Sequence, residues 1–230
     1  MVTAKLQGRG LLTPTQKQFL RLFSELPDQR YFYLTGGTAL AEFYLGHRLS
    51  FDLDFFTAEE GLILPASYAL EKHMEETGLE PTIVRRFSTF VEFLVTKGEE
   101  SLKVDLALDS PFRFAPPVPA EEGVLINNYQ DLRVDKLLAY FGRAEPRDAV
   151  DLYFILQEEP LGPILEQASI KDPGFDLYYF ALALEKSNGF PDKADRWPVK
   201  MLVEFNARLL KQLFHQYALM IMNQVAGRDV

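Results

Sequence analysis

The sequence predicts an α+β protein with a mixed β-sheet and flanking helices in its first half and a helical second half. Between residues 31 and 108, short runs of β-branched and aromatic residues alternate with helix-forming runs and break at glycines. Farther along, apolar residues recur at spacings of three and four, which is the period of an amphipathic helix. A proline-rich link at 111–119 lies between the two patterns. We therefore expect a core over residues 1–120 and a helical part over residues 121–230.

Local signals predict the individual elements. An entry helix is expected over 13–27, with Thr13 or Thr15 as its N-cap and Pro27 as its stop. Period-two alternation and β-branched content predict strands over 31–35, 51–56, 81–87, 90–98 and 102–108, the last two joined by a hairpin turn at 97–100. Helical periodicity or helix formers predict helices over 38–46, 65–77, around 134–141, from Pro146 onward and over 198–225.

Composition narrows the classes of function. With 47% hydrophobic residues among 230, the chain can bury a sizeable core without metals or disulfides. The absence of cysteine excludes disulfides, zinc thiolate sites and cysteine nucleophiles, and three histidines argue against a histidine zinc site. The net charge of -9 argues against broad, non-specific binding of nucleic acid but leaves a local basic cleft open.

The N-terminus and the hydropathy of the chain bear on its location. Residues 1–10 lack the apolar segment of a signal peptide, and no stretch approaches the roughly 18 apolar residues of a membrane span. We therefore expect a soluble, cytoplasmic protein that does not associate with membranes.

A glycine pair marks the first candidate for ligand binding. Gly36 and Gly37 separate the expected strand 31–35 from the helix that starts with Thr38. Glycines let the backbone approach a ligand closely, and the N–H groups that open a helix bind phosphate. Taken alone, the pair is equally consistent with a tight turn that binds nothing.

Two aspartates provide the second candidate. Asp52 and Asp54 alternate with apolar residues, so both side chains project from one face of the expected strand. Two carboxylates so close together repel each other unless a cation lies between them, and Mg²⁺ prefers such oxygen ligands. The alternative is an exposed edge strand with a solvated acidic face.

A third aspartate completes the pattern. Asp105 lies among apolar residues on the expected strand 102–108. If that strand neighbours 51–56, three carboxylates converge on two metal ions, which activate an attacking oxygen and neutralise a leaving pyrophosphate. Beside the glycine turn, Arg48 could neutralise a triphosphate and Ser50 could hydrogen-bond it, although Ser50 could equally satisfy the local backbone.

The combination of motifs resembles a known family. The segments GGTAL (36–40) and RLSFDLDFF (48–56), the later VDL (104–106), and Lys136 followed by RAEPRDAVDL (143–152) are similar to the signature of AbiEii/AbiGii toxin-type nucleotidyltransferases. These belong to the polymerase-β-like nucleotidyltransferase superfamily, with the MenT toxins as relatives. The resemblance covers about residues 31–156, and residues 157–230 carry no motif that we can match.

The resemblance implies roles for individual residues. Gly37 and Thr38, with Gly36 in the same turn, would contact nucleotide phosphates. Asp52 and Asp54 would hold both metals, and Asp105 would be the third ligand and a candidate base. Lys136 would bind a phosphate or the base, and Asp148 would support the site. From the residues alone, Lys136 could be an ordinary helix-surface lysine and Asp148 a favourable first-turn carboxylate.

The resemblance also implies an activity and partners. The expected reaction is Mg²⁺-dependent transfer of NMP from an NTP to an acceptor hydroxyl, with RNA or tRNA as the favoured acceptor and a protein or small molecule as the competitor. A toxin of a toxin–antitoxin or abortive-infection system, with a cognate antitoxin, is expected. A non-catalytic nucleotide-binding or interaction module is the alternative. Basic residues that could form an acceptor-binding rim are Arg85, Arg86, Lys97 and Arg113.

Overall fold

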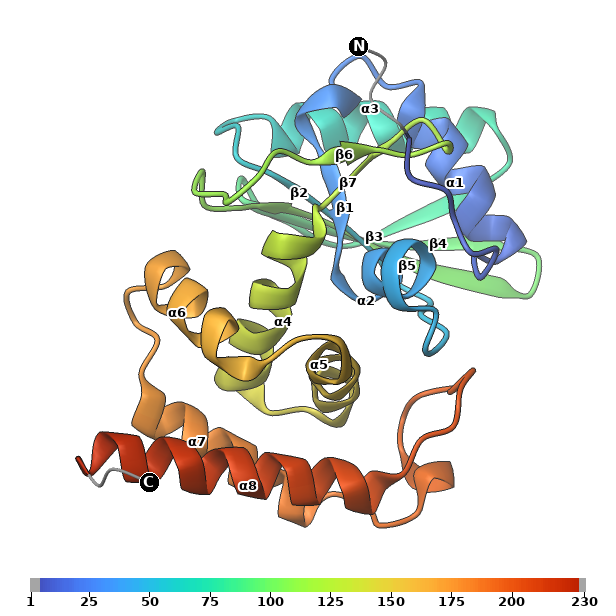
Figure 1. The fold of residues 1–230 in the computed structure, drawn as a ribbon. Helices are drawn as coiled ribbons and strands as arrows, with labels where there is room; N and C mark the ends of the chain where they lie inside the picture. The colour runs from blue at the N-terminus through green and yellow to red at the C-terminus, as the bar shows by residue number, and fades with distance from the viewer. Residues whose placement is uncertain (1–4, 228–230) are drawn as a thin grey trace. The chain divides into compact units, whose positions relative to one another are not determined.

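The computed structural model describes residues 5–227. The chain divides into two compact units, Met1–Tyr129 and Gln130–Val230, which are coloured blue to green and green to red in Figure 1. The units are described separately below.

The first unit is built on a mixed sheet with the strand order β3-β4-β5-β2-β1-β7-β6. The pairs β2–β5 and β1–β7 are parallel and the other neighbours are antiparallel, so the predicted mixed sheet is confirmed. The strands are β1 (Tyr33–Thr35), β2 (Leu53–Thr57), β3 (Glu80–Arg86), β4 (Phe90–Lys97), β5 (Glu100–Leu108), β6 (Val118–Pro119) and β7 (Leu125–Ile126).

Helices cover the sheet of the first unit (Figure 1). They are α1 (Pro14–Ser24), α2 (Gly36–Leu40), α3 (Ile63–Glu76), the 3-10 turn η1 (Gln29–Tyr31) and the π-helical turn η2 (Ala41–Leu45). Thr13, one of the two expected N-caps, caps α1, and the structure adds a capping box with Gln16. The helix ends at Ser24 rather than near Pro27. The ring of Phe23 stacks on that of Phe55 with centroids 3.9 Å apart, which fixes α1 to the central strand β2.

Two expected boundaries beside the glycine pair are shifted in the structure. The helix expected from Thr38 begins at Gly36, and the strand expected from Phe51 begins at Leu53. The last residue pair between β1 and β2 joins Thr35 to Asp54. Beyond this pair α2 begins at Gly36, and Asp52 lies just ahead of β2.

The second unit is helical, as predicted. Its helices are α4 (Tyr129–Arg143), α5 (Pro146–Glu158), α6 (Leu161–Lys171), α7 (Leu177–Glu185) and α8 (Ala207–Val225), with the 3-10 turns η3 (Lys186–Gly189) and η4 (Ala194–Arg196). Fully buried Tyr140 and Phe214 hold the core, with ring centroids 5.3 Å apart. The final helix starts after the Asn206 cap rather than at residue 198, because that side chain accepts hydrogen bonds from the first helical N–H groups.

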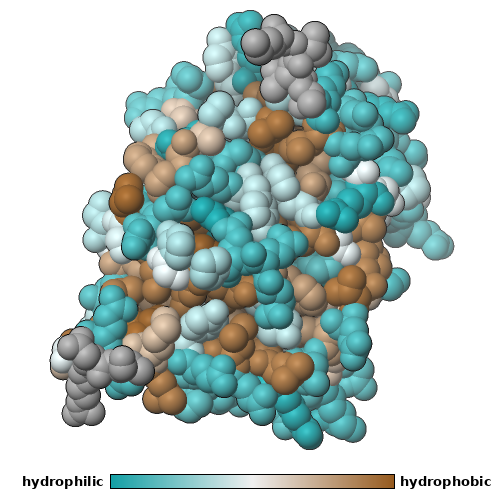
Figure 2. Space-filling model, in the orientation of Figure 1, coloured by the Kyte–Doolittle hydropathy of each residue, from teal (hydrophilic) through white to brown (hydrophobic). Residues whose placement is uncertain are grey.

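The surface carries both polar and hydrophobic residues. On the face drawn in Figure 2, hydrophilic residues surround separate hydrophobic patches. Of the helices between residues 5 and 227, none combines the length and hydrophobicity needed to cross a lipid bilayer.

Candidate active site

Two predicted site residues are direct neighbours in the sheet. Asp54 on β2 and Asp105 on β5 are register partners across the parallel strand pair. Their flanking residues Leu53, Val104 and Leu106 are buried on the other side of the strands. Because side chains alternate along a strand, both aspartates project from the opposite face. The prediction that these two acids lie on adjacent strands is therefore confirmed.

The same strand register adds Glu92 to Asp54 and Asp105, and these three carboxylates are called the acidic row below. Asp54 is opposite Thr35 on β1, and Asp105 is opposite Glu92 on β4. Glu92 is in turn opposite Arg85 on β3, with 3.6 Å between the Arg85 Nε and Glu92 Oε2 atoms. One row across five strands thus carries three carboxylates. Glu92 was missed in the sequence because its relation to Asp105 depends on strand pairing.

Lys103 is the other residue that the sequence analysis missed. Its Nζ atom donates a hydrogen bond of 2.5 Å to Oδ2 of Asp105, two residues away on the same face of β5. The spacing of two in Lys-Val-Asp could have indicated this contact. The ammonium therefore supplies a positive charge directly at the predicted metal ligand.

Burial and neighbouring charges alter the ionisation of this pair. Burial raises the pKa of Asp105, and nearby Glu92 and Asp52 raise it further, whereas Lys103 opposes the change only in part. Burial alone would lower the pKa of Lys103, but the hydrogen bond to Asp105 and the surrounding carboxylates together raise it. The acidic row thus carries an excess of negative charge that a cation can relieve.

The glycine turn lies against the acidic row. Gly36 has a φ of +72°, and a β-carbon added to it would lie 2.0 Å from Oδ2 of Asp54. Only glycine therefore combines this backbone conformation with the position of the carboxylate. A β-carbon on Gly37 would lie 2.5 Å from Nη2 of Arg48 and 2.8 Å from Oγ of Ser50. The structure thus brings the predicted phosphate-binding residues Arg48 and Ser50 to the predicted turn.

Two hydrogen bonds hold the backbone of residues 50–52, the segment that precedes β2. The Thr38 hydroxyl donates to the carbonyl oxygen of Asp52, and Gln16 Nε2 donates to the Ser50 carbonyl at 3.1 Å. Thr38 is buried and Arg48 is only 4% exposed. Thr38 therefore positions the backbone of Asp52, and its contact with a nucleotide stays a prediction.

The donor set fits a divalent cation. Oδ1 of Asp105 is buried without a hydrogen-bond partner, and such an atom is costly unless a cation or donor reaches it. Oxygen atoms of adjacent carboxylates are the ligands that Mg²⁺ prefers. Among residues 5–227, however, no group of three or more Asp, Glu, His or Cys side chains is already arranged to hold a metal. The predicted convergence of Asp52, Asp54 and Asp105 on metals stays a prediction.

Lys136 and Asp148 belong to the second unit. Lys136, on α4, is 6% exposed, and its Nζ atom lies 2.7 Å from Oδ2 of fully buried Asp151 on α5. Asp148 accepts hydrogen bonds of 2.5 and 2.8 Å from Arg143. Lys136 is thus not a solvated helix-surface residue, which was the simpler interpretation of the sequence. The roles of both residues toward a nucleotide stay predictions.

The four basic residues of the expected acceptor-binding rim differ in the contacts that their side chains make with neighbouring residues. The Arg85 side chain is 62% exposed. Arg86 is held by Glu71 at 2.6 Å and lies over the Tyr68 ring at 4.2 Å. Lys97 donates to Gln18, and Arg113 lies over the Tyr33 ring at 4.0 Å. Arg85 is therefore the best placed of the four to contact a ligand.

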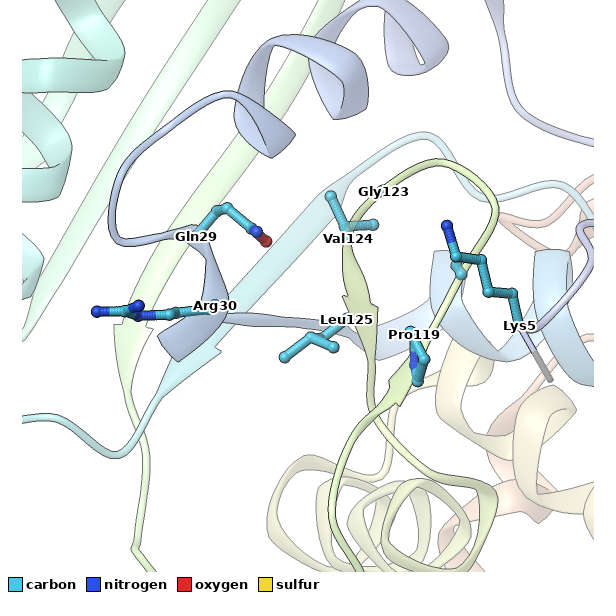
Figure 3. A pocket seen from close by; sticks show the side chains of 8 residues that line it. Lys5, Gln29, Arg30, Pro119, Gly123, Val124 and Leu125 are labelled. Atoms are coloured by element: carbon cyan, nitrogen blue, oxygen red, sulfur yellow. The ribbon is translucent and has the colours of Figure 1, made fainter. Parts of the chain in front are cut away.

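A small pocket elsewhere in the first unit contains none of the predicted site residues. It has a volume of about 210 Å³ and is lined by Lys5, Gln29, Arg30, Pro119, Ala120, Gly123, Val124 and Leu125 (Figure 3). Figure 3 shows the Arg30 guanidinium directed away from the other labelled side chains. The pocket therefore presents no convergent polar groups that would suggest a second reaction centre.

The mixed sheet brings the register-paired aspartates and the glycine turn together in the first unit. The sequence matches the family model described as "Nucleotidyl transferase AbiEii toxin, Type IV TA system" over residues 18–172. Since the match covers more than half of the chain, this protein belongs to the AbiEii toxin nucleotidyltransferase family.

Two solved structures illustrate the fold. JHP933 from Helicobacter pylori has a TM-score of 0.57 and 18% sequence identity, over 96% of this chain and 95% of that one. MenT4, a nucleotidyltransferase toxin from Mycobacterium tuberculosis H37Rv, has a TM-score of 0.59 and 17% identity, over 91% of this chain and 82% of that one. At these identities the likeness concerns the fold alone. No curated protein matches the sequence closely enough to add a relative.

Proposed function

We propose that this nucleotidyltransferase transfers NMP from an NTP to an acceptor hydroxyl with the help of Mg²⁺. The observation that carries the proposal is the register pairing of Asp54 with Asp105, beside a glycine turn that approaches the Asp54 carboxylate. Paired carboxylates beside a phosphate-binding turn are what a metal-assisted attack on a phosphate requires.

In the proposed reaction, the acceptor oxygen forms a bond to the α-phosphorus of the NTP. The bond from that phosphorus to the bridging oxygen breaks, and pyrophosphate leaves with the electron pair. Mg²⁺, held by Asp52, Asp54 and Asp105, would neutralise the charge that develops on the phosphates.

The protein's own groups position the reactants. The Arg48 guanidinium and the Ser50 hydroxyl, which both approach Gly37, would bind triphosphate oxygens together with the backbone of the turn. Asp105 would accept the proton of the acceptor hydroxyl. Holding the reacting groups in line supplies much of the rate in phosphoryl chemistry.

We propose RNA, with tRNA first, as the acceptor. The exposed Arg85 supports a local contact with phosphates despite the acidic chain as a whole. A protein hydroxyl or a small molecule is the competing acceptor. Membership of a toxin family of type IV toxin–antitoxin systems supports a cognate antitoxin that controls the activity.

Incubation of the purified protein with each α-labelled NTP, Mg²⁺ and either total RNA or total protein tests the proposal. Label in RNA that is lost in the Asp54→Ala variant is the expected result. Label in protein would identify the competing acceptor. No transfer to either fraction, together with retained nucleotide binding, would instead support a non-catalytic nucleotide-binding module.

A further inference from the structure

The ion pair between Lys103 and Asp105 suggests how the site is maintained before a metal arrives. The Asp105 side chain is 13% exposed, whereas that of Lys103 is 40% exposed. A buried carboxylate without a nearby cation is strongly unfavourable, and Lys103 provides that cation at 2.5 Å. The pair therefore stabilises the acidic row in the metal-free protein.

The other charges of the row do not replace Lys103. Glu92, the register partner of Asp105, adds a further negative charge, and its ion-pair distance to Arg85 is the longer 3.6 Å. Arg85 lies on β3, two strands away from β5. The closest positive charge that the structure gives for Asp105 is therefore the Lys103 ammonium.

An ammonium and a divalent cation compete for the same carboxylate. With Oδ2 of Asp105 bonded to Lys103, a metal at Oδ1, which is buried and has no hydrogen-bond partner, would lie within a few ångströms of a like charge. At such separations the repulsion between positive charges is large in a partly buried site. The flexible stem and partial exposure of Lys103 give its ammonium a route into solvent.

We propose that Lys103 is a built-in counter-ion that occupies the Asp105 carboxylate in the metal-free enzyme and is displaced when a divalent cation binds. Lys103 thereby weakens the binding of a metal ion in the absence of nucleotide. It also stabilises the folded protein when no metal is bound. This inference rests on the proposed metal-dependent function and names Lys103 as a positioning residue for it.

Mn²⁺ titration followed by electron paramagnetic resonance, with the full chain and no nucleotide, tests the inference. Lys103→Met removes the competing charge, so its Kd for Mn²⁺ should fall about tenfold or more below that of the wild type. Lys103→Arg keeps the charge and should retain weak binding. Lys72→Met is the matched control, because Lys72 lies on α3 with its side chain 79% exposed and should leave the Kd unchanged.

Thermal melting gives a second readout. In EDTA, Lys103→Met should melt below the wild type because Asp105 loses its counter-ion, and Mn²⁺ should raise its Tm more than that of the wild type. Lys103→Gln keeps an amide donor for Asp105 and repeats the test if the methionine variant folds poorly.

The outcomes separate this inference from the proposed function. Mn²⁺ binding by the wild type that Asp105→Asn abolishes supports the metal site. If the wild type binds Mn²⁺ in this way but Lys103→Met and Lys103→Gln bind it no more tightly, the inference about Lys103 is overturned and the metal site stands. If neither the wild type nor any Lys103 variant binds Mn²⁺, even with NTP present, the metal-dependent function is overturned as well.

Discussion

Asp54 and Asp105 face each other as register partners across the parallel strands β2 and β5. A slip of one residue in this pairing would move one of the two side chains to the buried face of the sheet. The proposed chemistry therefore depends on the same strand pairing that forms the core. Two neighbouring carboxylates also repel each other, so the arrangement lowers stability unless a cation lies between them.

Replacing Asp54 by Ala should abolish NMP transfer and leave the protein folded. Loss of one metal ligand should slow transfer on the order of a thousandfold or more, since charge neutralisation supplies several kcal/mol of the barrier reduction. The Tm should stay the same or rise, because repulsion with Asp105 is relieved. Transfer rate and Tm are measured on the same samples, with exposed Glu60→Ala as the control. Full activity in Asp54→Ala would place the chemistry elsewhere.

Alanine at the two glycines should have different effects. Gly36→Ala combines a φ of +72° with a contact of 2.0 Å to Asp54, so it should cost about 1–2 kcal/mol in backbone strain and also reduce transfer. In Gly37→Ala, the new β-carbon meets the ends of two flexible side chains, those of Arg48 and Ser50. The main loss should therefore be in affinity for the nucleotide, with a smaller loss in the free energy of unfolding. Denaturant unfolding and nucleotide titration of both variants check this. Equal losses of unfolding free energy in the two variants would contradict the different roles assigned to Gly36 and Gly37.

The buried pair Lys136–Asp151 allows a structural role to be separated from a catalytic one. Lys136→Met should destabilise the protein by about 3–5 kcal/mol, because the carboxylate of Asp151 is left buried without its ammonium partner. The double variant Lys136→Met/Asp151→Leu should recover most of that stability. If transfer also recovers in the double variant, Lys136 acts only in the fold. Transfer that stays lost at restored stability supports its predicted contact with the nucleotide.

Charge reversal at Arg85 and Arg86 should separate acceptor binding from stability. Arg85→Glu should reduce RNA modification and weaken the dependence of RNA affinity on salt, because Arg85 is exposed. Arg86→Glu should instead lower the Tm, since it breaks the ion pair with Glu71 and the contact with the Tyr68 ring. RNA modification that persists unchanged in the double variant would remove both residues from the acceptor site.

Glu122 should make stability depend on pH. Burial raises the pKa of this carboxyl, and Glu42 and Glu121 add to the effect. Ionisation therefore penalises the folded state above the raised folded pKa, and the penalty disappears below the ordinary pKa of glutamate. Glu122→Gln should raise the Tm by about 2 °C at pH 7 and leave it unchanged near pH 3.5. A gain that is the same at both pH values would assign the effect to packing.

Local sequence patterns were sufficient to predict the strands that carry Asp54 and Asp105 and the glycine turn beside them. Period-two alternation around Asp54 and Asp105 predicted strands with acids on one face, and the glycine pair predicted the break after β1. The predicted N-cap at Thr13 and the predicted turn after Lys97 are equally local, and both are present. Such features depend on residues a few positions apart, which a single sequence displays directly.

Features that depend on the order of strands could not be predicted. Glu92 joins the acidic row only because β4 lies beside β5, and β5 lies beside β2. Asp52 falls outside β2, beyond the last residue pair that β2 forms with β1. The short strands β6 and β7 contain two residues each, which is too few for any periodicity to appear in the sequence. Their place in the sheet comes from contacts between distant segments.

The parallel pairing of β1 with β7 has a consequence for the protein's own synthesis. Leu34 pairs with Ile126, and buried Asn127 donates to the Thr35 hydroxyl at 3.0 Å across 92 positions of the chain. The ribosome synthesises the chain from the N-terminus. The edge of β1 that pairs with β7 therefore remains open until residues 126 and 127 have left the ribosome. The sheet that carries Asp54 and Asp105 is therefore completed only after residues 126 and 127 have been translated.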